Sequence, residues 1–131
     1  MKKPYDIYRK TNVTTASRET ILLMMYEGAI RFLKQGMEAL QKENYSEMSK
    51  VLTRTQEIIS ELRATLNFEV GGELAVNLEK LYLFITQKLI QGNLEKSLGP
   101  LGEALQVLEN LHSTWQEAIE NLKKEQVTAE K

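Results

Sequence analysis

The chain has 131 residues, which suits a single domain with one core, and its 42% hydrophobic and 27% charged residues are the balance of an ordinary globular fold. Its longest apolar runs are far shorter than the roughly 18 to 20 residues that a bilayer span needs, so no membrane insertion is expected. The net charge is −1 and cysteine is absent, which excludes disulfides and thiolate chemistry and fits a reducing compartment.

The N-terminal segment is basic. Residues 1–20 carry five basic residues against two acidic ones, whereas the remainder carries twelve against sixteen. Four positive charges fall in the first ten residues without a further cluster, too weak a footprint to indicate nucleic-acid binding. No apolar stretch or small-residue cleavage site follows the first lysines, so a secretory leader is not expected.

Prolines and glycines divide the rest of the chain into four stretches of helical period. Ser17 is the candidate N-cap of the first helix, and Asn44 with Glu47 three residues later forms a capping-box pattern before the second. The glycine pair at 71–72 indicates the loop before the third helix, and Pro100 suits the first turn of the fourth. In a single domain over residues 1–131, we therefore predict a flexible arm over 1–16 and helices over 17–42, 45–67, 73–91 and 98–124.

Four helices of this length with short loops predict an all-α, antiparallel up-down-up-down four-helix bundle. The second helix has an apolar stripe about 120° wide, as such a bundle requires. In the first helix, the charged and amide residues from Glu27 to Glu38 fall within about 100°, and about 260° is apolar or glycine. We expect this helix to be the most enclosed, with the polar stripe facing solvent and Met24, Met25 and Tyr26 where core and arm meet.

The third helix carries apolar residues on two sides. Its predicted core face consists of Leu74, Leu78, Leu81, Tyr82, Ile85 and Leu89. Val76, Leu83 and Ile90 recur every seven residues about 160° from that face, among polar neighbours. Such a strip is typical of a helix-binding groove or a subunit interface, although scattered surface hydrophobic residues are common.

The fourth helix also has a wide apolar stripe. Its predicted core side consists of Leu98, Leu101, Leu105, Leu108, Trp115, Ile119 and Leu122. Val107, Leu111 and Ala118 extend this stripe to about 180°, wider than one packing partner requires. The predicted partner-binding residues of the third and fourth helices are Val76, Leu83, Ile90, Val107 and Leu111.

The sole histidine, His112, is the only candidate for metal or phosphate chemistry. It follows Glu109 at the Glu-x-x-His spacing of di-iron bundles, but such a site needs two pairs and two further carboxylates, so we expect no metal or cofactor. A histidine phosphotransfer domain remains an alternative, although no lysine or arginine lies near His112 on its helix. With no phosphate loop and no activated serine or cysteine, the chain is not expected to be an enzyme.

Five segments occur in a specific order along the chain: "YRKTNVTTASRET", "LLMMYEGAIRFLKQGMEAL", "TQEIISELRATLN", "GGELAVNLEKLYLFI" and "LHSTWQEAI". From Tyr8 to Ile119, the chain resembles the FliS family of flagellar secretion chaperones. The resemblance implies a cytoplasmic bundle that binds the C-terminal region of flagellin, prevents its premature polymerisation and delivers it to the flagellar type III export apparatus.

The resemblance also implies that the N-terminal arm covers the binding surface when flagellin is absent. By motif match, Tyr8 and Val13 correspond to an arm tyrosine and valine of the family, and Tyr5 and Ile7 match more loosely. A component of the export gate is a further candidate partner. Two alternatives stay open: a homo-oligomeric structural bundle, such as a homodimer joined through the strip of the third helix, and a phosphotransfer domain using His112.

Overall fold

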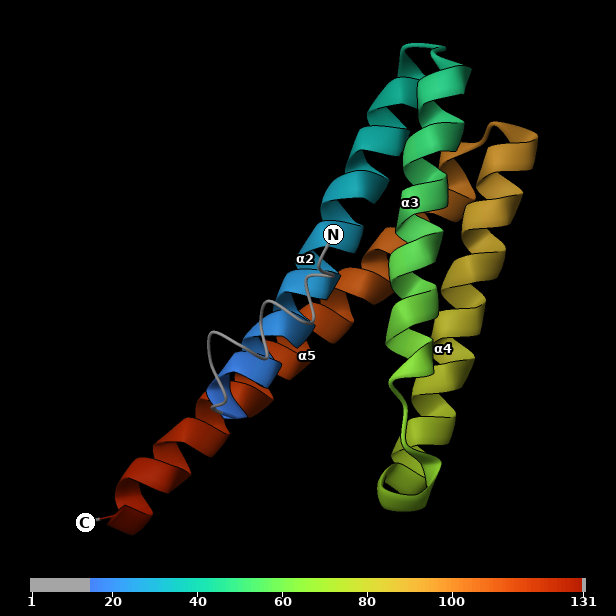
Figure 1. The fold of residues 1–131 in the computed structure, drawn as a ribbon. Coiled ribbons are helices and arrows are strands. Elements are labelled where there is room, and N and C mark those ends of the chain that lie inside the picture. Colours follow the sequence, from blue (N-terminus) through green and yellow to red (C-terminus); the bar gives the residue numbers. More distant parts are fainter. Residues whose placement is uncertain (1–14, 131) are drawn as a thin grey trace, which may run out of the picture.

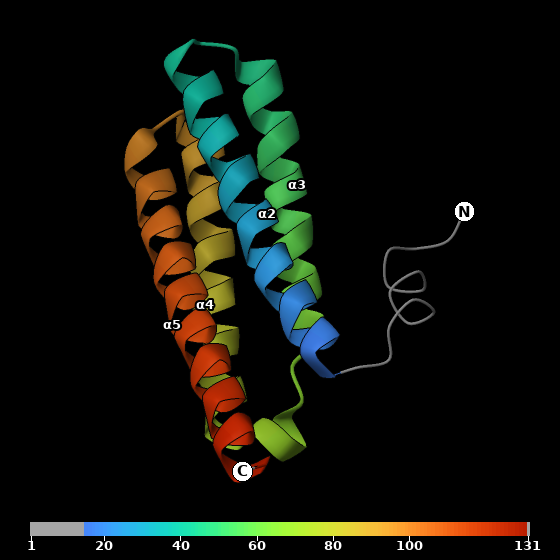
Figure 2. The same cartoon turned by 90° about the vertical axis from the view of Figure 1, so that its left-hand side faces the viewer.

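The computed structural model describes residues 15–130, and the side-chain surroundings of residues 18–128. Its helices are α2 (Thr15–Gln41), α3 (Tyr45–Ala64), α4 (Phe68–Glu95) and α5 (Leu98–Glu130). Short connections make successive helices antiparallel, and contacts run in the cycle α2–α3–α4–α5–α2 (Figures 1 and 2). The predicted all-α four-helix bundle is confirmed. In the part of the chain described, no helix combines the length and apolarity that a membrane crossing requires.

Several helix ends differ from the prediction. α2 begins at Thr15, so Ser17, the predicted cap, lies inside the first turn of the helix. Asn44 caps α3 as predicted, and its side chain accepts a hydrogen bond from the Glu47 backbone N–H at 3.3 Å. α5 continues to Glu130, past the predicted end at 124, because the polar residues there include no helix breaker.

The turn between α3 and α4 is shorter than predicted. α3 ends before 67, and Asn67 instead caps α4 by accepting hydrogen bonds from the backbone N–H groups of Glu69 and Val70 at 3.0 and 3.1 Å. The expected glycine loop is present as a break inside α4. At that break Gly72 has a φ of 51° and a ψ of −125°, a conformation that glycine adopts without a Cβ clash.

α4 ends beyond the predicted 91. The residue after its last turn, Lys96, adopts a left-handed φ of 53° and donates its N–H to the Gly92 carbonyl.

Two pairs of helices approach so closely at a glycine that a larger residue would not fit. A Cβ on Gly92 would lie 2.6 Å from Cγ of Leu101, which has no exposed surface. Likewise, a Cβ on Gly36 of α2 would lie 2.8 Å from Cδ2 of Leu52 of α3.

One core runs through the bundle, and every helix contributes to it. Its fully enclosed members include Tyr26, Leu33, Leu52, Ile59, Ile85, Leu89, Leu101 and Leu108. α2 has the largest share of buried and half-buried residues, as predicted, and its polar stripe from Glu27 to Glu38 faces solvent. Met24, expected near the core, is 61% exposed and lies in that stripe.

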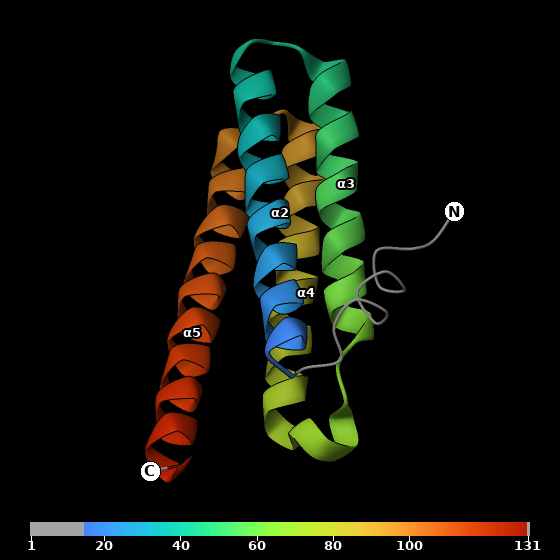
Figure 3. The same ribbon diagram turned by 60° about the vertical axis from the view of Figure 1, so that its left-hand side comes forward.

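The bundle opens toward the end that holds the α3–α4 turn, which we call the open end; the closed end holds the other two loops. α5 diverges from α4 toward the open end (Figures 1 and 3). Leu74, Leu81 and Leu122 were wrongly predicted as core, because these helices have separated there and leave them 57%, 36% and 44% exposed. Leu98, also predicted as core, is exposed at the first turn of α5. The remaining predicted core residues of α4 are buried: Leu78, Tyr82, Ile85 and Leu89.

We predict that Gly92→Ala destabilises the bundle by about 1–3 kcal/mol, because the added methyl displaces Leu101 at a close approach of α4 and α5. The matched control is Gly102→Ala on α5, where a Cβ meets nothing within 4 Å. That change is expected to be neutral or stabilising by up to about 1 kcal/mol through helix propensity. Urea unfolding of both variants measures the difference, and equal stabilities would contradict the close approach.

Candidate functional site

A row of aliphatic side chains is exposed on α4 on the side away from the core. Val76, Leu83 and Ile90 are 42%, 39% and 44% exposed, so they lie outside the core as the heptad spacing predicted. Leu94, four residues after Ile90, continues the row and is 78% exposed. We call these four residues the α4 strip. Leu94 was missed because the helix was expected to end at Gln91.

A second apolar surface lies where α4 faces α5. The ion pair between Lys88 and Glu103, at 2.9 Å, identifies the side of α4 that faces α5. Helical spacing from Lys88 places exposed Phe84, Leu81 and Leu74 on this side. On α5, Val107 and Leu111 follow Glu103 by four and eight residues, so they lie toward α4. Leu122 follows Leu111 by eleven residues, about three turns, and lies on the same side as Leu111. We define the α4–α5 face as Leu74, Leu81, Phe84, Val107, Leu111 and Leu122.

The five predicted partner-binding residues therefore lie on two surfaces. Val76, Leu83 and Ile90 belong to the α4 strip, whereas Val107 and Leu111 are half-buried on the α4–α5 face and also pack against the core. On a helical projection, the strip and the face are about 140–160° apart on α4. Exposed polar side chains lie between them: Lys80, Gln87 and Gln91. A partner that contacts both surfaces must pass around α4.

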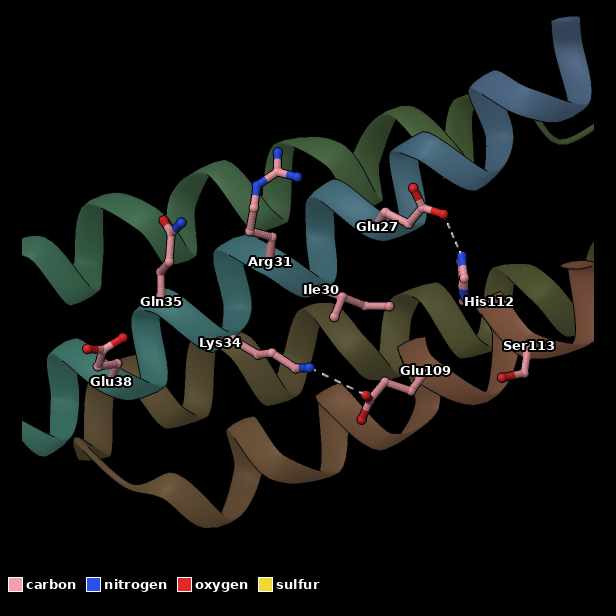
Figure 4. Close-up of a pocket in the computed structure, with 9 residues that line it drawn as sticks. All are labelled: Glu27, Ile30, Arg31, Lys34, Gln35, Glu38, Glu109, His112 and Ser113. Carbon is pink, nitrogen blue, oxygen red and sulfur yellow. Dashed lines mark hydrogen bonds and ion pairs between the residues drawn. The ribbon is translucent and has the colours of Figure 1, made fainter.

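A pocket lies elsewhere, between α2 and α5, and has a volume of about 580 Å³ (Figure 4). Two interactions join its walls: His112 Nε2 lies 2.9 Å from Glu27 Oε2, and Lys34 Nζ lies 3.8 Å from Glu109 Oε2. In Figure 4, Arg31 extends away from α5. Ile30 is the one aliphatic residue among its nine lining residues, whereas the two apolar surfaces consist of aliphatic and aromatic residues.

The surroundings of His112 favour a structural role. Its side chain is 19% exposed, and its Nε2 atom is directed at the Glu27 carboxylate, which would repel an incoming phosphoryl group. α2 does bring Lys34 into the same pocket, but its ammonium is directed at Glu109. Among the described residues, no three His, Cys, Asp or Glu side chains are grouped so that they could hold a metal ion.

The family model described as "Flagellar protein FliS" matches residues 1–122 of the chain. The chain belongs to the FliS family. Similar curated proteins include three that are named flagellar secretion chaperone FliS. The protein from Bacillus subtilis is 27% identical over 95% of this chain and 92% of its own length. The protein from Vibrio cholerae is 31% identical over 88% of each chain, and that from Campylobacter jejuni is 32% identical over 89% of this chain and 91% of its own length. The predicted resemblance is therefore confirmed, and the bundle is that of a flagellar chaperone family.

The match to the FliS family extends over the N-terminal arm, but the predicted arm residues lie outside the described part of the structure. These residues are Tyr5, Ile7, Tyr8 and Val13. Their proposed contact with the binding surface therefore stays a prediction. The described start of α2 places Tyr26 in the core and Met24 in solvent, so these neighbouring residues have opposite surroundings.

A polar cluster inside the core of this FliS-family bundle escaped the sequence analysis. The phenol oxygens of Tyr26 on α2 and Tyr82 on α4 are 2.5 Å apart, and the two side chains are 0% and 2% exposed. Trp115 of α5 donates its Nε1–H to the Tyr26 oxygen at 3.2 Å. We call these three residues the Tyr26 junction. It joins polar groups of three helices at one place and satisfies the two buried phenols.

Burial raises the pKa of both Tyr26 and Tyr82, since the phenolate form would lose its hydration in the core. In the unfolded chain, a tyrosine releases its proton near its ordinary pKa of about 10. Above that pH the unfolded state loses protons that the folded state keeps, so ionisation favours unfolding. The contribution of these two protonated phenols to the free energy of unfolding is fully present below about pH 10 and is lost as the pH rises further.

We predict that the double variant Tyr26→Phe, Tyr82→Phe loses less stability per pH unit above pH 10 than the unchanged protein. Each tyrosine contributes up to about 1.4 kcal/mol per pH unit to this loss. Urea unfolding between pH 9 and 11 measures the two slopes, and phenolate absorbance reports the ionisation directly. Identical slopes would mean that these phenols ionise as readily in the folded state as in the unfolded one.

Proposed function

We propose that this FliS-family protein binds the C-terminal helical region of flagellin in the cytoplasm, prevents its premature polymerisation and delivers it to the flagellar type III export apparatus. The relatives carry the name flagellar secretion chaperone, which supports a role in export. The proposed role is one of binding and needs no catalytic group, metal or cofactor. A component of the export gate is a second proposed partner, since delivery requires a contact with the apparatus.

The observation that carries this proposal is the α4 strip. Val76, Leu83, Ile90 and Leu94 form an aligned aliphatic row, with members two turns or one turn apart, on the side of α4 that the core does not use. An amphipathic partner helix buries such a row by placing its own apolar face against it, with anchors three, four and seven residues apart. The proposed partner, the C-terminal helical region of flagellin, is of this kind.

The second apolar surface suits a partner with more than one helical segment. Because the strip and the α4–α5 face lie on different sides of α4, one straight helix covers only one of them. A flexible chain can place one helix on the strip and another on the α4–α5 face. Ordering such a chain costs conformational entropy, which burial of apolar surface on both sides must exceed.

We predict that the triple variant Val76→Ser, Leu83→Ser, Ile90→Ser binds a C-terminal flagellin fragment about 10- to 100-fold more weakly. Each residue, about 40% exposed, loses about 0.5–1 kcal/mol of apolar burial in the complex. Calorimetry measures the dissociation constant, and circular dichroism checks that the helices remain. Val127→Ser serves as the control, because Val127 is similarly exposed, at 55%, but lies near the end of α5.

The same variant separates this function from a homo-oligomeric bundle. If the strip joins two copies of the chain, light scattering will show a concentration-dependent dimer that the triple variant abolishes while flagellin binding is unchanged. That result would replace the chaperone proposal with the structural one. Loss of helicity in the triple variant would show instead that the strip supports the fold, against its observed exposure.

We predict that deleting residues 1–12 changes the affinity and the enthalpy of flagellin binding. An arm that covers the binding surface lowers the apparent affinity by the fraction of closed molecules, so its removal should tighten binding. Calorimetry of the shortened and the full chain makes the comparison, with deletion of residues 127–131 as the control at the other terminus. An unchanged dissociation constant together with an unchanged enthalpy would exclude the lid.

A further inference from the structure

The Tyr26 junction lies where the bundle begins to open. Toward the closed end, the core layers of Leu33, Leu89 and Leu101 are fully enclosed. Toward the open end, residues 18–25 of α2 include no buried side chain, and Ile119 is the one buried residue among 112–128 of α5. The hydrogen bonds of the junction thus lie next to the last enclosed level of α2. Toward the open end, α5 leaves α4 (Figures 1 and 3).

The junction connects two helices, α2 and α4, that are not neighbours in the contact cycle. α2 and α4 lie across the diagonal of the contact cycle, yet the phenols of Tyr26 and Tyr82 meet at its centre. Nearer the closed end, α4 and α5 are joined directly by the ion pair of Lys88 and Glu103. Toward the open end, the described side chains connect these two helices by hydrogen bonds only through Tyr26, which accepts from Trp115.

Trp115 also belongs to the side of α5 that carries the α4–α5 face. Leu111 precedes it by four residues and Leu122 follows by seven, so the three side chains lie along the same side of the helix. Trp115 is half-buried and packs against the core. A change in its position therefore moves the apolar residues that a partner would contact.

We propose that the Tyr26 junction sets the separation of α4 and α5 at the open end and thereby determines which partner helix the α4–α5 face accepts. Tyr26, Tyr82 and Trp115 act as positioning residues, and the inference rests on the proposed function for the identity of the partner. Without the Tyr26 hydroxyl, the indole N–H and the Tyr82 hydroxyl lose their partner in a buried place. Water entering between the diverging helices satisfies these groups and separates α5 from α4.

Spin labels test the separation in the free protein, because the chain has no cysteine of its own. One labelled pair, Asn77→Cys with Asn121→Cys, spans α4 and α5 at the open end, and a control pair, Gln87→Cys with Gln106→Cys, spans them nearer the closed end. All four positions are exposed. With Tyr26→Phe, we expect a longer or broader distance distribution for the first pair and an unchanged one for the control pair.

Binding to a C-terminal flagellin fragment tests the consequence. We expect Tyr26→Phe to change the dissociation constant by about tenfold, the size of one or two buried hydrogen bonds. The matched control is Thr55→Val, which removes a fully buried hydroxyl that donates within α3 to the Val51 carbonyl at 3.0 Å. The hydrogen bond that this control removes lies within α3, so the variant loses stability without losing a polar connection to α4 or α5. Its affinity should stay within about twofold of the unchanged protein. Tyr82→Phe and Trp115→Phe, which each remove one bond, serve if Tyr26→Phe does not fold.

The two measurements have separate outcomes. Unchanged spin-label distances in Tyr26→Phe would show that the junction does not set the separation of α4 and α5, regardless of the dissociation constant measured for the flagellin fragment. Changed distances with an unchanged affinity, or equal losses of affinity in Tyr26→Phe and Thr55→Val, would overturn its role in partner selection. If the unchanged protein binds no flagellin, the proposed function fails, and the distances still decide whether the junction separates the helices.

Discussion

Each helix of a four-helix bundle can turn only part of its circumference toward the single core, commonly an arc of 100° or somewhat more. This chain has more apolar side chains than those arcs hold. α2 accommodates the excess by being the most enclosed helix, with Gly36 admitting Leu52 of α3 at close range. α4 and α5 do not, and their remaining apolar residues form the α4 strip and the α4–α5 face. The two candidate binding surfaces are therefore formed by the apolar residues of α4 and α5 that the core does not accommodate.

Local patterns predicted the helices, while the arrangement between helices was beyond them. The heptad of Val76, Leu83 and Ile90 correctly indicated exposure, because it depends only on the 3.6-residue period of one helix. Leu74 lies four residues before buried Leu78, on the same side of α4. Its exposure arises from the divergence of α5, a segment far away in the sequence. Leu94 was left out of the predicted strip because the helix was expected to end at 91. The sequence does not indicate the true end, since the residue with the left-handed conformation there is a lysine and not a glycine.

The Tyr26 junction illustrates the same limit inside the core. Tyr26 and Tyr82 each read as ordinary apolar positions, and 56 residues separate them in the chain. Their contact requires both helices to present these phenols at one level across the bundle. Sequence alone places a tyrosine on the correct face but gives no vertical register between helices. Polar connections of this kind therefore become visible only when the packed helices are compared.

The length of α5 has a consequence for local stability. Its 33 residues extend past the start of α2, and every residue from 120 to 128 is exposed (Figure 3). A helical end without packing on several sides depends on backbone propensity, and a few isolated turns are marginally stable in water. The end of α5 therefore frays by a local helix–coil equilibrium, independent of global unfolding. We therefore expect its amide hydrogens to exchange with solvent while those of the closed end remain protected.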